Sequence, residues 1–311
     1  MDRKIVSVKS YANIALIKYW GKADAVHMIP ATSSISLTLE NMFTETQLSF
    51  LPQTAVQDEF YINGIQQNAK EQAKISAVIN QFRKDKNQFV KVETSNNMPT
   101  AAGLSSSSSG LSALVKACND LFETGLSQQA LAQKAKFASG SSARSFFGPI
   151  AAWDKDSGEI YRVQTDLRLA MIMLVLNASP KPISSREGMR LTAQTSTNFA
   201  QWVEQSKKDY ADMLLYLKNN DFAKVGELTE RNALAMHATT KAAQPPFSYL
   251  TAASYQAMAF VKELRKQGES CYFTMDAGPN VKVLCLEKDL ERLAERFSDN
   301  YRIIVSRTKE L

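Results

Sequence analysis

The chain has 311 residues, of which 44% are hydrophobic and 22% are charged, as is usual for globular proteins. This composition is too apolar for a disordered chain, and 12 glycines and 9 prolines are too few for a fibrous or low-complexity protein. With 3 cysteines, the disulfide framework of small secreted domains is not expected. The length predicts about two domains.

The charge balance is mildly basic, with 37 Lys and Arg against 31 Asp and Glu, a net charge of +6. Such an excess fits either simple solubility or an anionic ligand. Nucleic-acid binding requires basic residues clustered on one face, and here they are spread along the chain, so we expect no nucleic-acid partner. The N-terminus lacks the pattern of a signal peptide, and the longest apolar run, residues 169–176, is far shorter than the roughly 20 residues that span a bilayer. We therefore expect a cytoplasmic enzyme or binding protein with no membrane partner.

The first half of the chain mixes strand and helix patterns. Short β-type runs predict strands at 11–17, 35–39, 44–51, 60–62 and 90–94. Asn63-Gly64 predicts a turn after the fourth of these runs. Apolar residues at helical spacing predict a helix that begins in the serine run after Pro99 and buries Leu111, Leu114, Val115, Cys118 and Leu121. A second helix, 127–137, has Ser127 as its predicted N-cap.

The second half is mostly helical at first. The apolar run 169–176 predicts a buried strand, and Pro180-Lys181-Pro182 predicts a link between domains 1–180 and 181–311. Helices are predicted at 198–217, 221–236 and 254–266, the last with Ser254 as N-cap and Gly268 as its stop. Strands at 271–275, 281–286 and 302–305, with a helix at 289–297, complete the chain. Helices mixed with hairpin-like strands favour an α+β fold over alternating parallel βαβ units.

A loop of small residues, PTAAGLSSSSSG at 99–110, leads directly into the predicted helix. The N–H groups of a helix's first turn lack intrahelical partners and carry partial positive charge, so such a loop can bind phosphate. Serine hydroxyls there can reach phosphate oxygens or a Mg²⁺ held on them. A flexible serine linker or a plain N-cap is the alternative, although a linker would not continue unbroken into an apolar helix. No lysine follows Gly103 or Gly110 as a Walker A motif requires.

Three further segments carry candidate site residues. Asp276 ends a strand before a glycine turn, MDAGPN, which suits a base aimed at a substrate hydroxyl, although a simple hairpin turn would look the same. SGSSARSFFG places Arg144 among hydroxyls, where its guanidinium could pair with carboxylate or phosphate, or lie on the surface after a helix cap. NIALIKYWGK places Lys18 and Lys22 around an aromatic pair, either to meet an anionic substrate or as a solvated edge.

The serine loop resembles the phosphate loop of the GHMP kinase superfamily. In this order, NIALIKYWGK, PTAAGLSSSSSG, SGSSARSFFG and MDAGPN resemble the mevalonate diphosphate decarboxylase family, and KYWGK and SGSSARS separate the chain from the plain kinases. SSISLTL at 33–39 and KPISSREGM at 181–189 are further matches. The serine run is heavier than the Ser-Ser-Ala pattern of the family, which leaves open which hydroxyl meets the metal.

The resemblance implies a two-domain α+β GHMP kinase fold. Its N-terminal, ATP-binding domain would be like ribosomal protein S5 domain 2, its C-terminal domain would be ferredoxin-like, and the active site would lie in the cleft between them. The implied activity is that of a carboxy-lyase in the mevalonate pathway of isoprenoid and lipid biosynthesis. ATP and mevalonate 5-diphosphate would give isopentenyl diphosphate, ADP, phosphate and CO₂, through phosphorylation of the 3-hydroxyl. ATP as co-substrate, Mg²⁺, a cytoplasmic location and a homodimer are implied as well.

The resemblance also implies roles for residues of this chain. Asp276 would be the catalytic base on the 3-hydroxyl, with Lys18 beside it to hold it ionised, and Arg144 would bind the substrate carboxylate. The remaining substrate contacts would be Tyr19, Lys22, Ser139, Ser141, Ser185, Arg186 and, for the transferred phosphate, Lys181. The ATP phosphates would be held by Pro99, Ala101, Ala102, Gly103, Leu104, Ser105, Ser106, Ser107, Ser108 and Ser109, with Ser107 next to Mg²⁺.

Two other functions stay open from the sequence. A GHMP-family kinase acting on mevalonate, or on its 3-hydroxyl, would have much the same loop and aspartate but would release no CO₂. A non-catalytic nucleotide-binding regulator should have lost the base or the arginine, whereas Asp276 and Arg144 are both present. Neither His27 nor His237 has neighbours at metal-ligand spacing, so no zinc site is expected. The three cysteines are predicted to be buried structural thiols.

Overall fold

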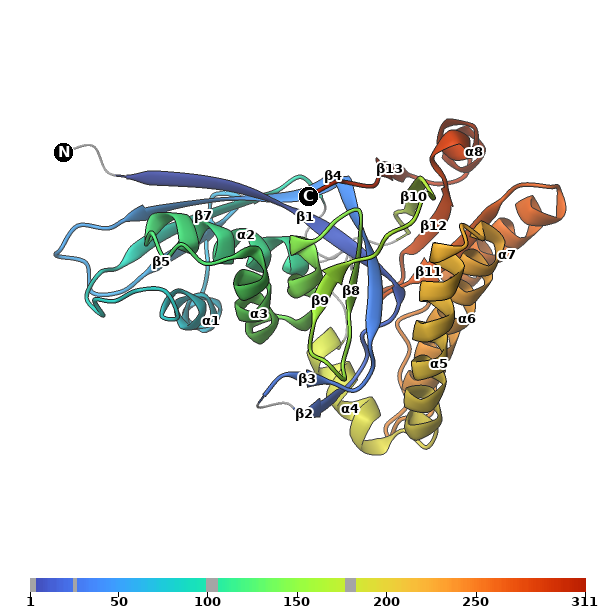
Figure 1. Cartoon of the computed structure of the whole chain (residues 1–311), viewed down its shortest axis with the longest axis horizontal. Helices are drawn as coiled ribbons and strands as arrows, with labels where there is room; N and C mark the ends of the chain where they lie inside the picture. The colour runs from blue at the N-terminus through green and yellow to red at the C-terminus, as the bar shows by residue number, and fades with distance from the viewer. Residues whose placement is uncertain (1–3, 25–26, 99–105, 177–182) are drawn as a thin grey trace. The chain divides into compact units, whose positions relative to one another are not determined.

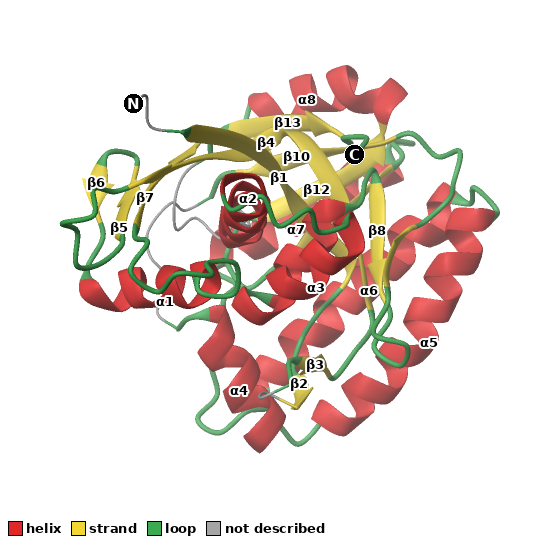
Figure 2. Ribbon diagram, turned by 60° about the vertical axis from the view of Figure 1, so that its left-hand side comes forward, coloured by secondary structure: helices red, strands yellow, loops and turns green. Residues whose placement is uncertain are grey.

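The computed structural model of the chain describes residues 4–24, 27–98, 106–176 and 183–311 (Figure 1). For Ser106, Ser107 and Ala138 the backbone alone is described. Helices and mostly antiparallel strands alternate along the chain without a regular βαβ repeat (Figure 2). The predicted α+β class is therefore confirmed.

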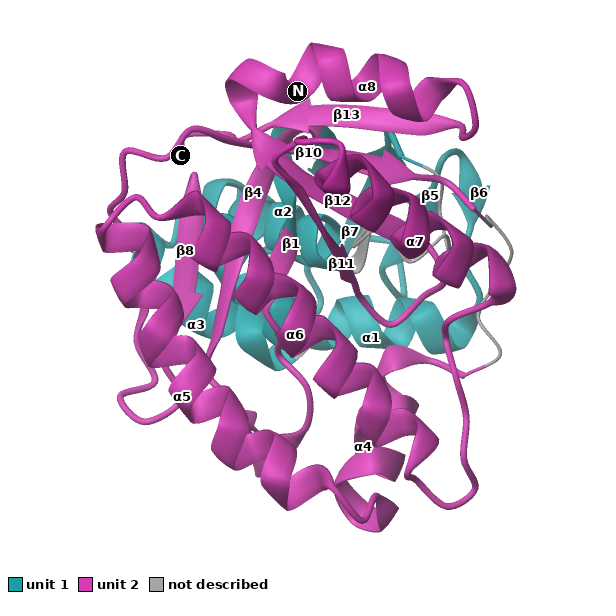
Figure 3. Cartoon of the chain, turned by 90° about the vertical axis from the view of Figure 1, so that its right-hand side faces the viewer, with its two compact units in different colours: residues 1–13, 42–98, 105–146 teal, residues 14–41, 99–104, 147–311 magenta. Residues whose placement is uncertain are grey.

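The chain divides into two compact units, drawn in different colours in Figure 3. Unit 1 comprises residues 1–13, 42–98 and 105–146, and unit 2 comprises residues 14–41, 99–104 and 147–311. Two long strands, β1 (Ile5–Ile17) and β4 (Ser34–Phe50), contribute residues to both units and pair with each other. The expected domain boundary between residues 180 and 181 lies outside the described residues and stays a prediction.

Unit 1 is built on the last part of β4, which pairs antiparallel with β7 (Val90–Asn96). Strand β5 (Glu59–Ile62) runs parallel to β7 and forms a hairpin with β6 (Ile65–Gln66). The two residues of this hairpin turn, Asn63 and Gly64, have φ angles of 48° and 78°, as a tight turn of this kind requires. The predicted Asn-Gly turn is thus confirmed. The helices of unit 1 are α1 (Ala69–Ile79), α2 (Ser106–Leu121), α3 (Gln128–Ala138) and the 3₁₀ helix η1 (Gly140–Phe146).

Helix α2 begins inside the serine run, as its apolar spacing predicts. Leu114, Val115, Cys118 and Leu121 are buried, and Leu111 is half-buried. Ser127 caps helix α3 by accepting a hydrogen bond from the N–H of Ala130, which confirms the second predicted helix start.

Unit 2 contains a four-stranded antiparallel sheet in the order β11 (Cys271–Met275), β12 (Val281–Leu286), β10 (Leu169–Leu174) and β13 (Ile303–Arg307). The first part of β4 pairs with β8 (Ile150–Trp153), which pairs with β9 (Ile160–Arg162). A short ribbon joins β2 (Lys22–Asp24) to β3 (Ile29–Pro30). The helices of unit 2 are α4 (Ser185–Thr195), α5 (Phe199–Lys218), α6 (Phe222–Lys241), α7 (Ala252–Lys266), the 3₁₀ helix η2 (Glu287–Asp289) and α8 (Leu290–Ser298).

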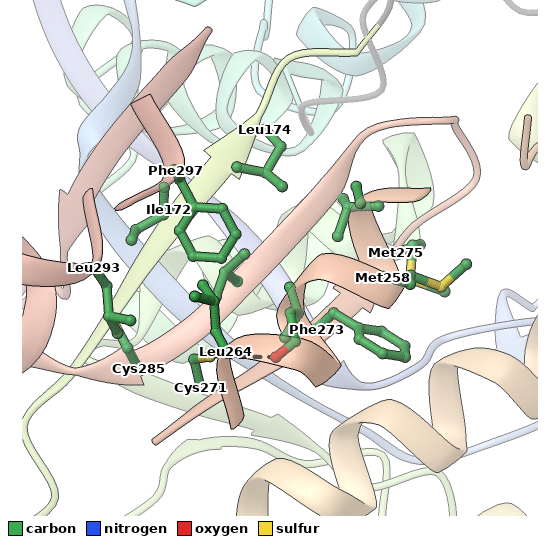
Figure 4. Packing of buried hydrophobic residues seen from close by; sticks show 14 of the residues in the cluster. Ile172, Leu174, Met258, Leu264, Cys271, Phe273, Met275, Cys285, Leu293 and Phe297 are labelled. Carbon is green, nitrogen blue, oxygen red and sulfur yellow. Dashed lines mark hydrogen bonds between the residues drawn. The ribbon is translucent and has the colours of Figure 1, made fainter. Parts of the chain in front are cut away.

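Strand β11 packs against helices α6, α7 and α8. Phe273 joins a buried apolar cluster with Leu264 of α7 and Phe297 of α8 (Figure 4). The neighbouring Tyr272 points to the other face, where its ring lies against Gly226 of α6, because side chains alternate along a strand. The apolar cluster and helix α6 thus hold strand β11 in place. They thereby also position Asp276, the residue that directly follows β11.

Several sequence expectations need correction. Residues 35–39 and 44–51 are one continuous strand, β4, because nothing between them interrupts the extended backbone, although Glu40 and Asn41 are exposed. Helix α7 is capped by Thr251, and Ser254 is the third helical residue of a capping box, so the predicted N-cap was three residues late. Helices α1 and α4 and strands β2, β3, β6 and β9 were not predicted.

All three cysteines are buried and free, which confirms their prediction as structural thiols. Burial raises the pKa of Cys271 and of Cys285 to about 12 and raises that of Cys118 further. Because the thiolate is the reactive form, we expect the native protein to react only slowly with Ellman's reagent at pH 8. All 3 thiols should react at once in denaturant, and fast labelling of the native protein would contradict this expectation.

Among the described helices, none combines the length and the hydropathy that crossing a bilayer requires.

Candidate active site

The first part of the site is a carboxylate held by two buried lysines in unit 2. Asp276 directly follows β11, and its Oδ1 accepts a hydrogen bond of 2.8 Å from Lys18 Nζ. Lys282 of β12 places its Nζ 3.2 Å from Oδ2. The side chains of Lys18 and Lys282 are 2% and 0% exposed, whereas that of Asp276 is 22% exposed. The carboxylate is therefore the member of this cluster that a ligand can reach.

The two ammonium groups determine the charge of Asp276. Burial alone would raise the pKa of this carboxyl, but Lys18 and Lys282 outweigh burial and hold the pKa well below its usual range. Asp276 is thus ionised at neutral pH. Its Oδ2 is buried, and among the described residues no group donates a well-aligned hydrogen bond to it, although Lys282 lies 3.2 Å away.

A buried hydrogen-bond chain fixes the position of Lys18. Its backbone N–H donates to Oδ1 of Asn232 at 2.9 Å, and Asn232 Nδ2 donates to Oδ2 of Asp209 at 2.9 Å. Nζ of Lys18 also donates a hydrogen bond to the carbonyl oxygen of Ala15 at 2.8 Å. Asn232 and Asp209 are both fully buried. They hold the backbone directly after β1 in place. Neither of them hydrogen-bonds to Asp276 in the described part of the chain.

His237 of α6 is a neutral neighbour of this cluster. Its side chain is 2% exposed, and burial, together with the positive charge of Lys18, lowers its pKa to about 3. The ring packs edge-to-face against Tyr249 at 6.3 Å between centroids. His237 therefore adds no charge to the site at neutral pH.

The segment after Lys18 leads to a second group of cations. Tyr19 stacks on Trp153 with 5.4 Å between ring centroids. The indole N–H of Trp20 donates to Oγ1 of Thr239 at 3.1 Å. Lys22 lies in β2, which packs against α4, the helix that carries Ser185 and Arg186 in its first turn. Burial and the charge of Arg186 lower the pKa of Lys22. Two cations held near each other in this way suit a polyanionic ligand.

Gly21 allows this segment to pass close to helix α5. Its φ is +94°, and a Cβ atom there would collide with the ring of Phe199. We expect Gly21→Ala to lower the free energy of unfolding by about 1–3 kcal/mol from backbone strain and contact together, and to raise KM for an anionic substrate by displacing Lys22. Urea unfolding and steady-state kinetics measure the two effects.

Gly125→Ala is the matched control for this change. Gly125 has a φ of +61° with no described atom within 4 Å of an added Cβ, so it introduces the backbone strain without the collision. Equal effects of the two substitutions on KM would contradict a positioning role for Gly21.

The arginine that the sequence singles out lies in unit 1. Arg144 belongs to η1 and is 2% exposed, and its Nη2 lies 3.4 Å from Oδ1 of Asn13. Asn13 Nδ2 donates to the carbonyl oxygen of Ser141 at 2.9 Å and to Oγ of Ser145 at 2.7 Å. The hydroxyls of Ser139 and Ser141 are 3.2 Å apart. The structure thus places Arg144 and both predicted serines in one polar cluster, which Asn13 connects.

Most of the serine loop lies outside the described residues. Pro99, Ala101, Ala102, Gly103, Leu104, Ser105 and Lys181 lie outside the described residues, and so do the side chains of Ser106 and Ser107. Ser108 and Ser109 are fully buried, and Ser109 Oγ hydrogen-bonds with Oγ1 of Thr44 at 2.7 Å. The ATP and Mg²⁺ contacts of this loop therefore stay predictions.

The described end of the loop fits a phosphate group. Helix α2 has 16 residues and starts within the serine run, and its first turn contains no acidic residue. Its N-terminal N–H groups and dipole can therefore attract an anion. In the described ranges there is no cluster of three or more His, Cys, Asp or Glu that could hold a metal ion.

The chain matches two family models along nearly its whole length. Residues 10–162 match the diphosphomevalonate decarboxylase-like N-terminal domain, and residues 171–310 match the mevalonate 5-diphosphate decarboxylase C-terminal domain. Diphosphomevalonate decarboxylase mvd1 of Aspergillus fumigatus is 33% identical, over 94% of this chain and 80% of that protein.

Solved structures agree with these matches. The mevalonate pyrophosphate decarboxylase from Streptococcus pyogenes is 74% identical, with a TM-score of 0.96 over 100% of this chain and 98% of that one. A structure described as MDDEF in complex with MVAPP, AMPPCP and magnesium is 41% identical, with a TM-score of 0.91 over 99% of this chain and 98% of that one. These likenesses confirm the two-domain GHMP kinase fold. The chain therefore belongs to the diphosphomevalonate decarboxylase family of the GHMP kinase superfamily.

Proposed function

We propose that the chain catalyses the ATP-dependent decarboxylation of mevalonate 5-diphosphate to isopentenyl diphosphate, within the mevalonate pathway of isoprenoid biosynthesis. The observation that carries the proposal is Asp276, an ionised and partly exposed carboxylate held between Lys18 and Lys282. The family to which the chain belongs supports the choice of substrate.

The reaction needs ATP for a chemical reason. Loss of CO₂ alone would leave an electron pair without an acceptor, and a tertiary hydroxyl is a poor leaving group. Phosphorylation of the 3-hydroxyl turns it into a phosphate ester. Phosphate then leaves with the C–O electron pair. The electron pair of the C–C bond to the carboxylate forms the new double bond as CO₂ departs.

Asp276 acts on the 3-hydroxyl in this proposal. Its carboxylate accepts the hydroxyl hydrogen bond, orients the hydroxyl oxygen toward the γ-phosphate and receives the proton as the new O–P bond forms. Because the two lysines keep its pKa low, Asp276 is a weak base, and the proton moves late, when the hydroxyl is already acidified by bonding to phosphorus. General-base contributions of this kind are about 10²–10⁴-fold.

Cationic groups bind the two ends of the substrate. Arg144, with Ser139 and Ser141, binds the carboxylate, for which a guanidinium offers two parallel N–H donors. The diphosphate is assigned to Tyr19, Lys22, Ser185 and Arg186, and the transferred phosphate to Lys181. Lys22 and Arg186 are close enough to repel each other, and a polyanion bound between them would neutralise both charges.

ATP is assigned to the loop 99–109 and the start of α2, with Mg²⁺ next to Ser107. When bound, Mg²⁺ would neutralise charge on the phosphates. The first-turn N–H groups of α2 hold the same phosphates from the protein side. This assignment is consistent with the described relative that contains MVAPP, AMPPCP and magnesium. We further propose that the protein is a homodimer, which sedimentation of the purified protein tests. We also propose a cytoplasmic location.

Joint measurement of ADP and CO₂ tests the proposed function. Purified protein, ATP, Mg²⁺ and carboxyl-labelled mevalonate 5-diphosphate should give both products. ADP without labelled CO₂ would instead indicate a kinase, and nucleotide binding without either product would indicate a non-catalytic regulator.

A further inference from the structure

Lys282 is an unusual residue for its place in the fold. It lies in β12 between Val281 and Val283, opposite Thr274 of β11 and Met173 of β10, and its side chain is fully buried. A buried ammonium group is costly unless a counter-charge lies close to it. Its counter-charge is Oδ2 of Asp276 at 3.2 Å. Among the described residues, Lys282 forms an ion pair with one carboxylate, that of Asp276. This carboxylate is the proposed catalytic group.

The two oxygens of Asp276 face different lysines. Lys18, at the end of β1, donates to Oδ1 at 2.8 Å, and Lys282 lies near Oδ2 at 3.2 Å. The third titratable neighbour, His237 of α6, is neutral. Two positive charges therefore face one negative charge, and Lys18 alone would already neutralise the carboxylate.

Contacts at both oxygens also restrict rotation. A carboxylate held only through Oδ1 could turn about its Cβ–Cγ bond and change the direction in which Oδ2 points. Lys282 opposes this rotation, because turning Oδ2 away would lengthen the 3.2 Å ion pair of a buried ammonium group. The side chain of Lys282 is 0% exposed, so we expect it to affect the reaction through its ion-pair partner Asp276 and not by contact with the substrate.

We propose that Lys282 is a positioning residue of the decarboxylation, which fixes the orientation of the Asp276 carboxylate and, together with Lys18, keeps it charged. This inference rests on the proposed function of Asp276. Its test compares three single variants: Lys282→Met, which removes the charge, Lys282→Arg, which keeps it, and Lys262→Met as a matched control. Lys262 lies on the exposed side of α7, above the ring of Phe273, so its loss changes the net charge equally but leaves Asp276 untouched.

The first readout is the titration of Asp276 itself. In protein with ¹³C-labelled aspartate carboxyls, the Asp276 signal is identified by its loss in Asp276→Asn. Because a neighbouring cation lowers a carboxyl pKa by about 1–3 units, Lys282→Met should raise the titration midpoint by about one pH unit or more. Lys282→Arg should stay near the wild-type midpoint, and Lys262→Met should match the wild type.

The second readout is the pH dependence of kcat/KM for CO₂ release. For Lys282→Met we expect the acid limb of the profile to move to higher pH, with a loss of about tenfold or more at the acid end that shrinks as the pH rises. Lys282→Arg should restore most of the activity. If Lys282→Met does not fold, Lys282→Gln takes its place, because its amide can still hydrogen-bond to Oδ2 without a charge.

Two results would overturn the proposal. One is a folded Lys282→Met or Lys282→Gln protein with the wild-type titration and pH profile. The other is a loss of activity that is equal at every pH and is not restored by Lys282→Arg, which would indicate a structural role alone. The carboxyl titration needs no turnover. Absence of CO₂ release by the wild type would therefore count against the proposed function, while the titration would still decide whether Lys282 controls Asp276.

Discussion

Asp276→Asn is expected to lower the rate of CO₂ release by about 10²–10⁴-fold, while binding of an ATP analogue persists. The substitution keeps the shape of the side chain but removes the negative charge that Lys18 and Lys282 hold in place. The amide can no longer accept the hydroxyl proton. Initial rates of CO₂ release and calorimetric titration with AMPPCP measure the two expectations.

The variant must also be compared with the wild type in stability. Two buried ammonium groups lose their counter-ion, and breaking a buried ion pair on one side costs about 3–5 kcal/mol. Retained nucleotide binding would show that the loss of rate is not a loss of folding. Asp299→Asn, at the exposed end of α8, is the matched control and should behave as the wild type. An Asp276→Asn protein with the wild-type rate would remove Asp276 from the mechanism.

Arg144→Lys is expected to produce the second large effect, a fall in kcat/KM for mevalonate 5-diphosphate of about 30-fold or more. A buried charged partner is worth about 2–5 kcal/mol in a complex, and Lys cannot reproduce the two parallel donors of the guanidinium. Arg144 is 2% exposed and lies against Asn13 in η1, so the shorter and differently shaped cation cannot simply move into its place.

Steady-state kinetics with the substrate varied at saturating ATP measures this effect. Arg162→Lys, at a 40% exposed arginine of β9, is the matched control and should leave both kinetic constants unchanged. The KM for ATP should also stay close to the wild-type value in Arg144→Lys. A variant with unchanged kcat/KM for the substrate would exclude Arg144 from binding its carboxylate.

The sequence predicted those parts of the site that lie in short contiguous motifs. Asp276, Lys18 and Arg144 could be proposed from the sequence because each belongs to a short motif whose residue types suit a base or an anion-binding group, and the structure places Lys18 against Asp276. Strands β11 and β12 were predicted with their observed bounds, since both are uninterrupted runs of mostly apolar residues between a glycine and a turn. Helix α2 was predicted because its apolar positions repeat with helical spacing.

The rest of the site depends on contacts between residues distant in the sequence. Asn232 binds the backbone of Lys18, from which 214 positions separate it, and no local pattern marks such a pair. Asn13 is a second example, because its hydrogen bonds join it to Arg144 and Ser145, which are 131 and 132 positions away in the sequence. Lys282 did leave a signal, a lysine within the apolar strand sequence VKVLCL, since a charge in a buried strand needs a partner. The partner itself could be named only from the structure.

The missed elements have a similar cause. Helix α4 is mostly polar, and of its eleven residues only Gly188 and Thr192 are buried, so it offers too few apolar residues for a helical repeat to be noticed. The continuous strand β4 was divided in two because Glu40 and Asn41 interrupt the apolar alternation. In the structure β4 pairs with β8 before these two residues and with β7 after them.

A single-turnover experiment tests the central claim most directly. Excess protein, with ATP and Mg²⁺, is mixed with carboxyl-labelled mevalonate 5-diphosphate, quenched over time and assayed for ADP and labelled CO₂. The account predicts one CO₂ for each ADP in the wild type, and neither product on the same time scale in Asp276→Asn. ADP formed by the wild type without CO₂, or CO₂ released by Asp276→Asn at the wild-type rate, would contradict it.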